Sequence, residues 1–478
     1  MLTDIYDVVI VGAGPIGLAT AIGLRQRGIN NILVLDQTHA FRRVGQILDL
    51  LPNGLKSLKY LADHAYEAVK NTALGGSNSQ SSNQQENSAK PTLKWVYRNL
   101  QGEEIRSVPL SFDHWLQEYG EGRVTLAWYD LQTTLRQQLP SEIVRANHRC
   151  VNVIDEPENH CVRLDCISDM TSENNPYAHW QENKTDEIDN NYQQSVTNTS
   201  FRARLVVAAD GINSTIRQVL YKDSLYENYA KPEYSGFAAI LCRETVDINQ
   251  ELAAEIEAKF LHNSPIATIC HDEVSRKTAT AMEDTRMMLF RSRTTNQFGY
   301  LIHVASPLAA LQNQSGSSLI NLALQAFEQA KFPDILQQLV RLSPPENMAQ
   351  RPYYIHRAII ADSENLPIQP TWNFGRVVLV GDAAHGMPPF MAQGANQGLE
   401  DALAVVLLIA QIALDNNWNN TQAIAAAFQK YEQLRRPWMA YVQEATLNRH
   451  PYSSENNWQQ YSQTIYGRNI DQVIQALA

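Results

Sequence analysis

Cysteine is scarce in this sequence and follows no recognised pattern. The 478 residues contain five cysteines, no two of which form a CxxC pair: Cys150, Cys161, Cys166, Cys242 and Cys270. An odd, scattered set is a poor basis for a disulfide framework, and its spacing matches no zinc site. We therefore expect reduced thiols, no bound metal and a cytoplasmic location.

The chain also lacks an excess of basic residues and long hydrophobic runs. Its 39 Lys and Arg against 50 Asp and Glu give a formal net charge of −11, which argues against binding to nucleic acid. The N-terminus has no basic stretch of the signal-peptide kind. The longest apolar helix candidate, residues 402–414, is shorter than the about 20 residues that span a bilayer. We expect a small-molecule partner and no transmembrane segment, and the oligomeric state stays open.

The chain begins with an alternation of apolar strands and Gly-rich turns. Asp7–Val11 is an apolar run of strand length, followed by a Gly-rich turn, helix-spaced apolar residues to Leu24 and a second strand at Ile32–Leu35. This order predicts a right-handed βαβ unit. Leu205–Ala209 and Val377–Val380 are apolar on both faces, as central strands of a parallel sheet are. The sequence thus predicts an α/β fold with a Rossmann-like domain.

The middle of the chain has a different character. Residues 234–243, 287–293 and 298–304 alternate in polarity and predict half-exposed antiparallel strands. They favour a second, antiparallel-sheet domain inserted into the first, with helices at the C-terminal end. The expected division is 1–72, 120–225 and 355–415 for the first domain, 91–119 and 226–354 for the second, and 416–478 for the helical segment.

Two polar stretches interrupt this plan. Residues 75–90 are rich in Gly, Ser, Asn and Gln, and residues 170–200 are polar and acidic. Such compositions offer too little apolar surface to offset the entropy of ordering. We interpret both stretches as mobile surface insertions, with an ordered lid over a site as the alternative.

The first motif with chemical meaning is Gly12-Ala13-Gly14-Pro15-Ile16-Gly17, between the first strand and its helix. Gly12 permits a tight turn, Gly14 lets the backbone approach a pyrophosphate, and Gly17 permits close packing of helix on strand. The free N–H groups of a helix start favour phosphate. Asp36, after the second strand, can accept hydrogen bonds from ribose hydroxyls. The motif predicts a dinucleotide site without choosing between FAD and NAD.

Two further segments resemble motifs of a known family, and this resemblance favours FAD over NAD. Residues 209–217, Ala-Asp-Gly-Ile-Asn-Ser-Thr-Ile-Arg, form on their own no more than a turn. They resemble the Asp-Gly motif of the FAD-dependent aromatic hydroxylases, the single-component, p-hydroxybenzoate hydroxylase-like flavoprotein monooxygenases. Residues 375–402, with Gly381-Asp382, Pro388-Pro389 and Gly394-Ala395-Asn396, closely resemble the ribityl motif of that family. The resemblance spans the chain through three motifs in the family's order.

The resemblance implies FAD as the cofactor, NAD(P)H as a transient reductant, and O2-dependent hydroxylation of a small, aromatic substrate through a flavin C4a-hydroperoxide. It also implies that Asp210 orders the pyrophosphate and the nicotinamide donor, and that Asp382 accepts hydrogen bonds from the ribityl hydroxyls. The helix start at Gly394 should face the flavin edge on which negative charge develops. The expected FAD contacts are Gly12, Ala13, Gly14, Pro15, Ile16, Gly17, Asp36, Arg43, Asp210, Gly381, Asp382, Pro389, Gly394, Ala395 and Asn396.

One segment departs from the family pattern. The family has an arginine shortly before the Asp-Leu pair of a helix, whereas this chain has Trp128-Tyr129-Asp130-Leu131. The departure puts some flavin contacts in doubt. Arg42 and Arg43 lie where the family often places an arginine near the cofactor, and a solvated charged pair is the alternative.

The sequence does not identify the catalytic groups. A phenolic substrate needs a general base or hydrogen-bond acceptor, and His271, Arg291 and His303 on the expected substrate sheet are candidates, each with a structural role as the alternative. His385 is a fourth candidate, for which a hydrogen-bonded turn histidine is the simpler interpretation. An epoxidase or dehydrogenase on the same FAD frame, and a flavin-binding protein without turnover, remain alternatives.

Overall fold

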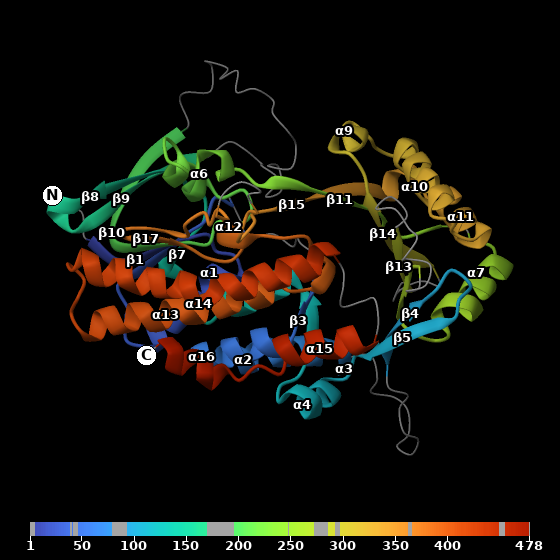
Figure 1. The fold of residues 1–478 in the computed structure, drawn as a ribbon, viewed down its shortest axis with the longest axis horizontal. Helices are drawn as coiled ribbons and strands as arrows, with labels where there is room; N and C mark the ends of the chain where they lie inside the picture. The colour runs from blue at the N-terminus through green and yellow to red at the C-terminus, as the bar shows by residue number, and fades with distance from the viewer. Residues whose placement is uncertain are drawn as a thin grey trace.

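The computed structural model places two sheets side by side along the long axis of the molecule (Figure 1). It describes residues 5–38, 41, 46–78, 93–169, 196–246, 248–271, 285–291, 297–361, 366–448 and 455–477. Long helices run below the first sheet, and shorter helices lie beside the second (Figure 1).

The apolar runs from the start, middle and end of the chain assemble into the first sheet. Its parallel strands lie in the order β17-β10-β1-β2-β7. Their bounds are β1 (Ile5–Val11), β2 (Ile32–Leu35), β7 (Val144–Arg145), β10 (Val196–Ala208) and β17 (Val377–Leu379). Three antiparallel strands complete the eight: β8 (Arg149–Glu156), β9 (Cys161–Asp169) and β16 (Asn373–Phe374). The predicted βαβ unit and the Rossmann-like sheet are confirmed.

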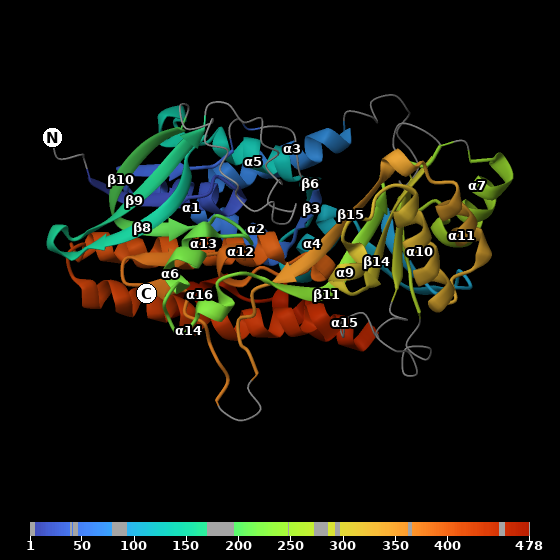
Figure 2. The same cartoon turned by 90° about the horizontal axis from the view of Figure 1, so that it is seen from above.

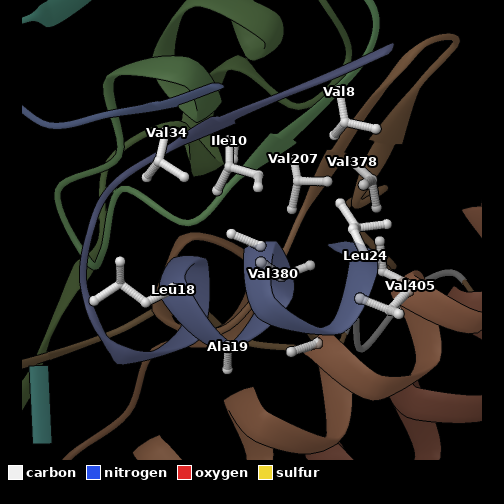
Figure 3. Close-up of a cluster of buried hydrophobic side chains, with 14 of the residues drawn as sticks. Val8, Ile10, Leu18, Ala19, Leu24, Val34, Val207, Val378, Val380 and Val405 are labelled. Carbon is white, nitrogen blue, oxygen red and sulfur yellow. The ribbon is translucent and has the colours of Figure 1, made fainter. Parts of the chain in front are cut away.

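Helices cover the lower face of this sheet. Helix α1 (Pro15–Gln26) follows β1, and α13 (Gly394–Leu414) packs against it. Figure 3 shows the core between them, where valines and an isoleucine of the sheet meet Leu18 and Leu24 of α1 and Val405 of α13. The chain then continues through α14 (Thr421–Asn448), α15 (Glu455–Ile465) and α16 (Ile470–Leu477). These last helices agree with the expected helical C-terminal segment.

Helix α13 is longer than expected. It has 21 residues rather than the 13 of residues 402–414, because the polar segment from Gly394 to Asp401 is helical as well. Within the described part of the chain, it is the one helix long and apolar enough to cross a membrane by length and composition. However, 72% of its apolar window is buried inside the protein, as in a core helix.

The second sheet has the order β15-β11-β14-β13-β12-β4-β5. Its strands are β4 (Lys94–Arg98), β5 (Glu104–Pro109), β11 (Glu233–Cys242), β12 (Ile266–Ile269), β13 (Arg286–Arg291), β14 (Phe298–Ala305) and β15 (Met348–Ile355). The three predicted strands are confirmed, although the end of the one expected at 287–293 lies outside the described residues. The sheet is not wholly antiparallel, since β12 and β4 pair in parallel. These two strands come from distant parts of the chain, so no hairpin fixes their direction.

One face of the second sheet is covered and the other is open. Helices α7 (Gln250–Ile256), α10 (Ser317–Gln329) and α11 (Asp334–Arg341) pack on the covered face with Tyr300, Ile302 and Met287. Because side chains alternate along a strand, Leu301, His303 and Met288 point the other way, into a cavity. Figure 2 shows this sheet beyond the ends of the first, with β3 (Ile47–Leu50) and β6 (Val124–Ala127) between the two.

The bounds of the two expected insertions need correction. Residues 75–78 belong to helix α3 (Asp63–Asn78), and residues 196–200 belong to β10, which pairs with β9. The start of the first polar stretch is therefore helical, and the end of the second is part of a strand. Residues 79–90 and 170–195 lie outside the described residues. The division into domains stays a prediction.

Candidate active site

One continuous cavity joins the two sheets. It has a volume of about 2490 Å³ and extends from the carboxyl ends of β1, β2 and β10 to the open face of the second sheet. Ligand pockets usually measure about 300–1,000 Å³. The cavity therefore has room for a large cofactor and a second molecule beside it, at the edge where open α/β sheets bind ligands.

The glycine motif forms one wall of the cavity. A Cβ at Gly12, which has φ +104°, would lie 2.3 Å from the carbonyl oxygen of Ala209, and a Cβ at Gly17 would lie 2.0 Å from the Gly12 carbonyl oxygen. Both positions thus require glycine because backbones touch there. At Gly14 the nearest such atom is 3.9 Å away, on the Trp128 ring, so this glycine leaves the wall open to a ligand.

Asp36 is held in place at the end of β2. Its Oδ2 accepts a hydrogen bond from the Ala13 N–H at 2.6 Å, and its Oδ1 accepts one from the Thr38 N–H at 2.8 Å. Gln132 of α5 (Trp128–Arg136) donates to the Ala13 carbonyl oxygen at 2.7 Å. The carboxylate and the glycine turn therefore form one rigid unit beside the cavity.

Asp210 has a structural bond for each oxygen. Oδ1 accepts from the Ser214 hydroxyl at 2.6 Å and Oδ2 from the Ile216 N–H at 3.1 Å, at the start of α6 (Thr215–Tyr221). Burial raises the pKa of this carboxyl group. Arg217 in the same segment donates to the carbonyl oxygens of Ala383 and Ala384 at 3.0 and 2.9 Å, so it joins the Asp-Gly motif to the Gly-Asp motif.

Asp382 faces the cavity without a partner. It begins the short helix α12 (Asp382–His385), and no residue in the described ranges donates a hydrogen bond to its carboxylate. The side chain is open to the cavity, yet protein surrounds that space, and this desolvation raises the pKa of the carboxyl group. A ligand with hydrogen-bond donors that fills this space would find in Asp382 an acceptor without a protein partner.

The expected cofactor contacts separate into two groups. Those that line the cavity are Gly12, Gly14, Pro15, Ile16, Asp36, Asp210, Asp382, Pro389, Gly394 and Ala395. Ala13, Gly17, Gly381 and Asn396 are buried and are not among the residues that line the cavity. Arg42 and Arg43 lie outside the described residues. Trp128 lines the cavity at Gly14, so an uncharged ring stands where the family has its arginine.

Comparison with known proteins agrees with this geometry. The model of the FAD binding domain family matches residues 5–44 and 363–446. The 6-hydroxynicotinate 3-monooxygenase of Bordetella bronchiseptica is 24% identical over 456 residues, which cover 94% of this chain and 91% of that protein. The phenazine 1,6-dicarboxylic acid hydroxylase PhzS of Lysobacter antibioticus is 23% identical over 93% of this chain and 89% of its own length.

Over nearly its whole length the chain is similar to FAD-dependent aromatic hydroxylases. It is an FAD-dependent monooxygenase, an oxidoreductase of a family that takes its electrons from NAD(P)H. Solved structures share its fold: a salicylate hydroxylase substrate complex has a TM-score of 0.64 at 17% identity, covering 99% of this chain and 98% of that one. Klebsiella pneumoniae HpxO with FAD and uric acid has a TM-score of 0.58 at 16% identity, with 99% and 95% covered.

A buried ionic network supports the Gly381-Asp382 loop from behind. Asp401 of α13 accepts hydrogen bonds at Oδ2 from the Gly381 N–H at 2.9 Å and from His385 Nε2 at 2.6 Å. Its Oδ1 accepts one from Arg435 Nε at 2.7 Å. Burial raises the pKa of Asp401, but His385 and Arg435 outweigh that effect and lower it to about 2. Asp401 is therefore an anion that fixes the residue before Asp382.

The four catalytic candidates occupy different surroundings. His385 is 1% exposed and binds Asp401 outside the cavity lining. His271 lies within 2.8 Å of the Ala330 carbonyl oxygen, also outside the lining. Arg291 lines the cavity and is paired with Glu257. His303 lines the cavity beside the residue that follows Pro389, since its ring meets Phe390 edge to face at 4.9 Å.

Sequence reasoning missed three groups in the cavity. Tyr353 on β15 brings its hydroxyl to 3.2 Å from His303 Nδ1. Asp49 on β3 and Arg123, just before β6, form an ion pair at 2.8 Å. All three residues line the cavity. None stands in a local motif, and only the alternation of residues along each strand would have indicated which side chains face inward.

Proposed function

We propose that this protein hydroxylates a small aromatic molecule, with NAD(P)H and O2 as co-substrates. The observation that carries the proposal is the convergence of Asp36, Asp210 and Asp382, from three distant motifs, on one cavity that continues over the open face of the second sheet. The relatives support an aromatic substrate, since their names specify 6-hydroxynicotinate, 3-amino-4-hydroxybenzoate and a phenazine dicarboxylic acid.

We infer one orientation for FAD in the cavity from the residues that line it. The turn of residues 12–17 and the start of α1 would bind the pyrophosphate, and Asp36 the ribose of the adenosine half. Asp382 would accept hydrogen bonds from the ribityl hydroxyls, and Gly394 and Ala395 at the start of α13 would face the flavin ring. Bound FAD supplies electron transfer from NAD(P)H and the activation of O2. Asp210 would also position the nicotinamide donor.

The substrate would lie on the other side of the flavin site. Met288, Phe290 and Leu301 provide an apolar surface for an aromatic ring and exclude water from it. His303, together with the Tyr353 hydroxyl, would accept the proton of a substrate hydroxyl and make the ring electron-rich. Of the four candidates His303 is the one we assign, because it contacts the residue after Pro389.

Two further proposals concern the whole chain. We keep the division into an FAD domain of residues 1–72, 120–225 and 355–415, a substrate domain of 91–119 and 226–354, and a helical segment of 416–478. We also keep a cytoplasmic location, supported by five cysteines that are all free and buried.

Cofactor release and NAD(P)H consumption test this function. The purified protein should be yellow and should release FAD, rather than FMN or NAD, on denaturation. Its NAD(P)H oxidation should accelerate when an accepted aromatic compound is added. A protein that binds no FAD on reconstitution, or whose NAD(P)H oxidation is unaffected by a broad aromatic library, contradicts the proposal.

A further inference from the structure

Asp49 lies on a wall of the cavity next to the start of helix α13. It is on β3, directly opposite Thr125 on β6. Asn396, near the start of α13, donates its Nδ2 to the Asp49 carbonyl oxygen at 2.9 Å, and its Oδ1 accepts from the Leu51 N–H at 2.8 Å. Because Asn396 is completely buried, this part of β3 is fixed to the same helix start that would face the flavin.

The Asp49 side chain is fixed as firmly as its backbone. Arg123 Nη2 donates to Asp49 Oδ2 at 2.8 Å, and the Thr125 hydroxyl donates to Asp49 Oδ1. Arg123 is 6% exposed, and its guanidinium lies 6.0 Å from the Trp95 ring and 5.7 Å from the Trp115 ring. The arginine therefore balances the charge of Asp49 from behind and holds its rotamer.

Asp49 and Thr125 give this wall of the cavity free hydrogen-bond acceptors, beside the guanidinium of Arg123. Thr125 gives its single hydroxyl hydrogen to Asp49, so its oxygen can only accept further bonds. The Asp49 carboxylate has about four lone-pair sites, of which Arg123 and Thr125 occupy two. Asp49, Thr125 and Arg123 all line the cavity; Arg123 donates Nη2 to Asp49, and no residue in the described ranges accepts from its Nε. A ligand therefore meets the free lone pairs of Asp49 and Thr125 beside a guanidinium that already balances the charge of Asp49.

We propose that Asp49, assisted by Thr125, binds a hydroxyl or amino substituent of the aromatic substrate other than the hydroxyl that faces His303. The site thereby selects a substrate that donates a hydrogen bond at this point and disfavours a carboxylate there. A carboxylate would leave two anions side by side, whereas a phenol or aromatic amine satisfies the free lone pairs. Arg123 is a positioning residue in this arrangement. The inference rests on the proposed function, because it takes the part of the cavity beside the start of α13 as the substrate site.

Three probes with one ring system test this selection: 2-naphthol, 2-naphthylamine and 2-naphthoate. Their dissociation constants are measured with the FAD-loaded protein by the perturbation of the flavin spectrum. We expect the naphthol and the amine to bind about 10- to 100-fold more tightly than the carboxylate, the range for a hydrogen bond to a charged group. Asp49→Asn, which keeps the shape and removes the charge, should reduce this preference by at least about 10-fold.

Two further variants separate this role from a structural one. Thr125→Val should weaken 2-naphthol binding and leave FAD content unchanged, and it serves if Asp49→Asn fails to fold. Glu244→Gln is the control, since it also removes one negative charge from the cavity lining but at another place. It should leave the preference within about twofold.

The outcomes distinguish this inference from the proposed function. A preference for 2-naphthoate, an equal preference in wild type and Asp49→Asn, or no binding of any probe overturns the role of Asp49. If 2-naphthoate alone accelerates NAD(P)H oxidation, the monooxygenase assignment stands and the selection for a donor is wrong. Absence of bound FAD, by contrast, overturns the proposed function itself.

Discussion

Replacing Arg435 by methionine tests whether the ionic network behind the Gly381-Asp382 loop maintains the site. Arg435 is 2% exposed and donates to Asp401 Oδ1 at 2.7 Å, Glu400 Oε2 at 2.6 Å and Gln397 Oε1 at 2.6 Å. Its removal deprives the buried Asp401 of its arginine partner and leaves it His385 and the Gly381 N–H, while Glu400 keeps Arg468. Breaking a buried ion pair in this way costs about 3–5 kcal/mol.

The predicted result is a loss of about 3–5 kcal/mol in the free energy of unfolding, together with weaker FAD binding. FAD affinity should fall because Asp401 fixes the Gly381 backbone directly before Asp382. The assay is urea denaturation of the FAD-loaded protein, followed by flavin fluorescence and far-UV circular dichroism. Arg357→Met is the matched control, since Arg357 pairs with Glu233 at an exposed site where such pairs contribute about 0–1 kcal/mol. Equal losses of unfolding free energy in the two variants would show that the buried ion pairs of Arg435 contribute no more than an exposed pair.

Three other predictions concern the acids and one histidine. Asp36→Ala should weaken FAD binding by about 1–3 kcal/mol without abolishing reduction at saturating FAD, and titration of the apoprotein with FAD measures this. Asp210→Ala should slow reduction by NAD(P)H more than Asp382→Ala does, and equal stopped-flow rates would remove the donor role of Asp210. Burial and Arg217 hold the pKa of His356 well below its usual value. The folded state then keeps His356 neutral while the unfolded chain binds a proton below about pH 6.5, so stability falls as the pH drops through that range. His356→Gln should flatten this fall between pH 7.5 and 5, and an unchanged slope would show that another group causes it.

Many of the residues expected to contact FAD could be predicted, because the chemistry of a dinucleotide site depends on local sequence. A turn that admits a pyrophosphate requires glycine at fixed spacing, and an acid at the end of the next strand follows from the same βαβ geometry. Gly14, Asp36 and Asp382 accordingly line one cavity, although they are far apart in the chain. The family prediction, made from three such motifs, is confirmed.

The residues expected to contact the substrate could not be predicted to the same degree. His303 was one of several equal candidates, and its relation to Tyr353 depends on two strands that are not neighbours in the sheet. Asp49 and Arg123 meet only because β3 pairs with β6 across more than seventy residues of chain. No local spacing specifies such a pair. The parallel pairing of β12 and β4 was missed for the same reason.

The proposed hydroxylation requires that the protein insert one atom of O2 into an aromatic substrate with electrons from NAD(P)H. Turnover under oxygen-18-labelled O2, with an aromatic compound that accelerates NAD(P)H oxidation, measures this directly by mass spectrometry of the product. We expect a hydroxylated product that carries one labelled oxygen atom. An unlabelled product, or complete conversion of the consumed O2 to hydrogen peroxide with the aromatic compound unchanged, would contradict it.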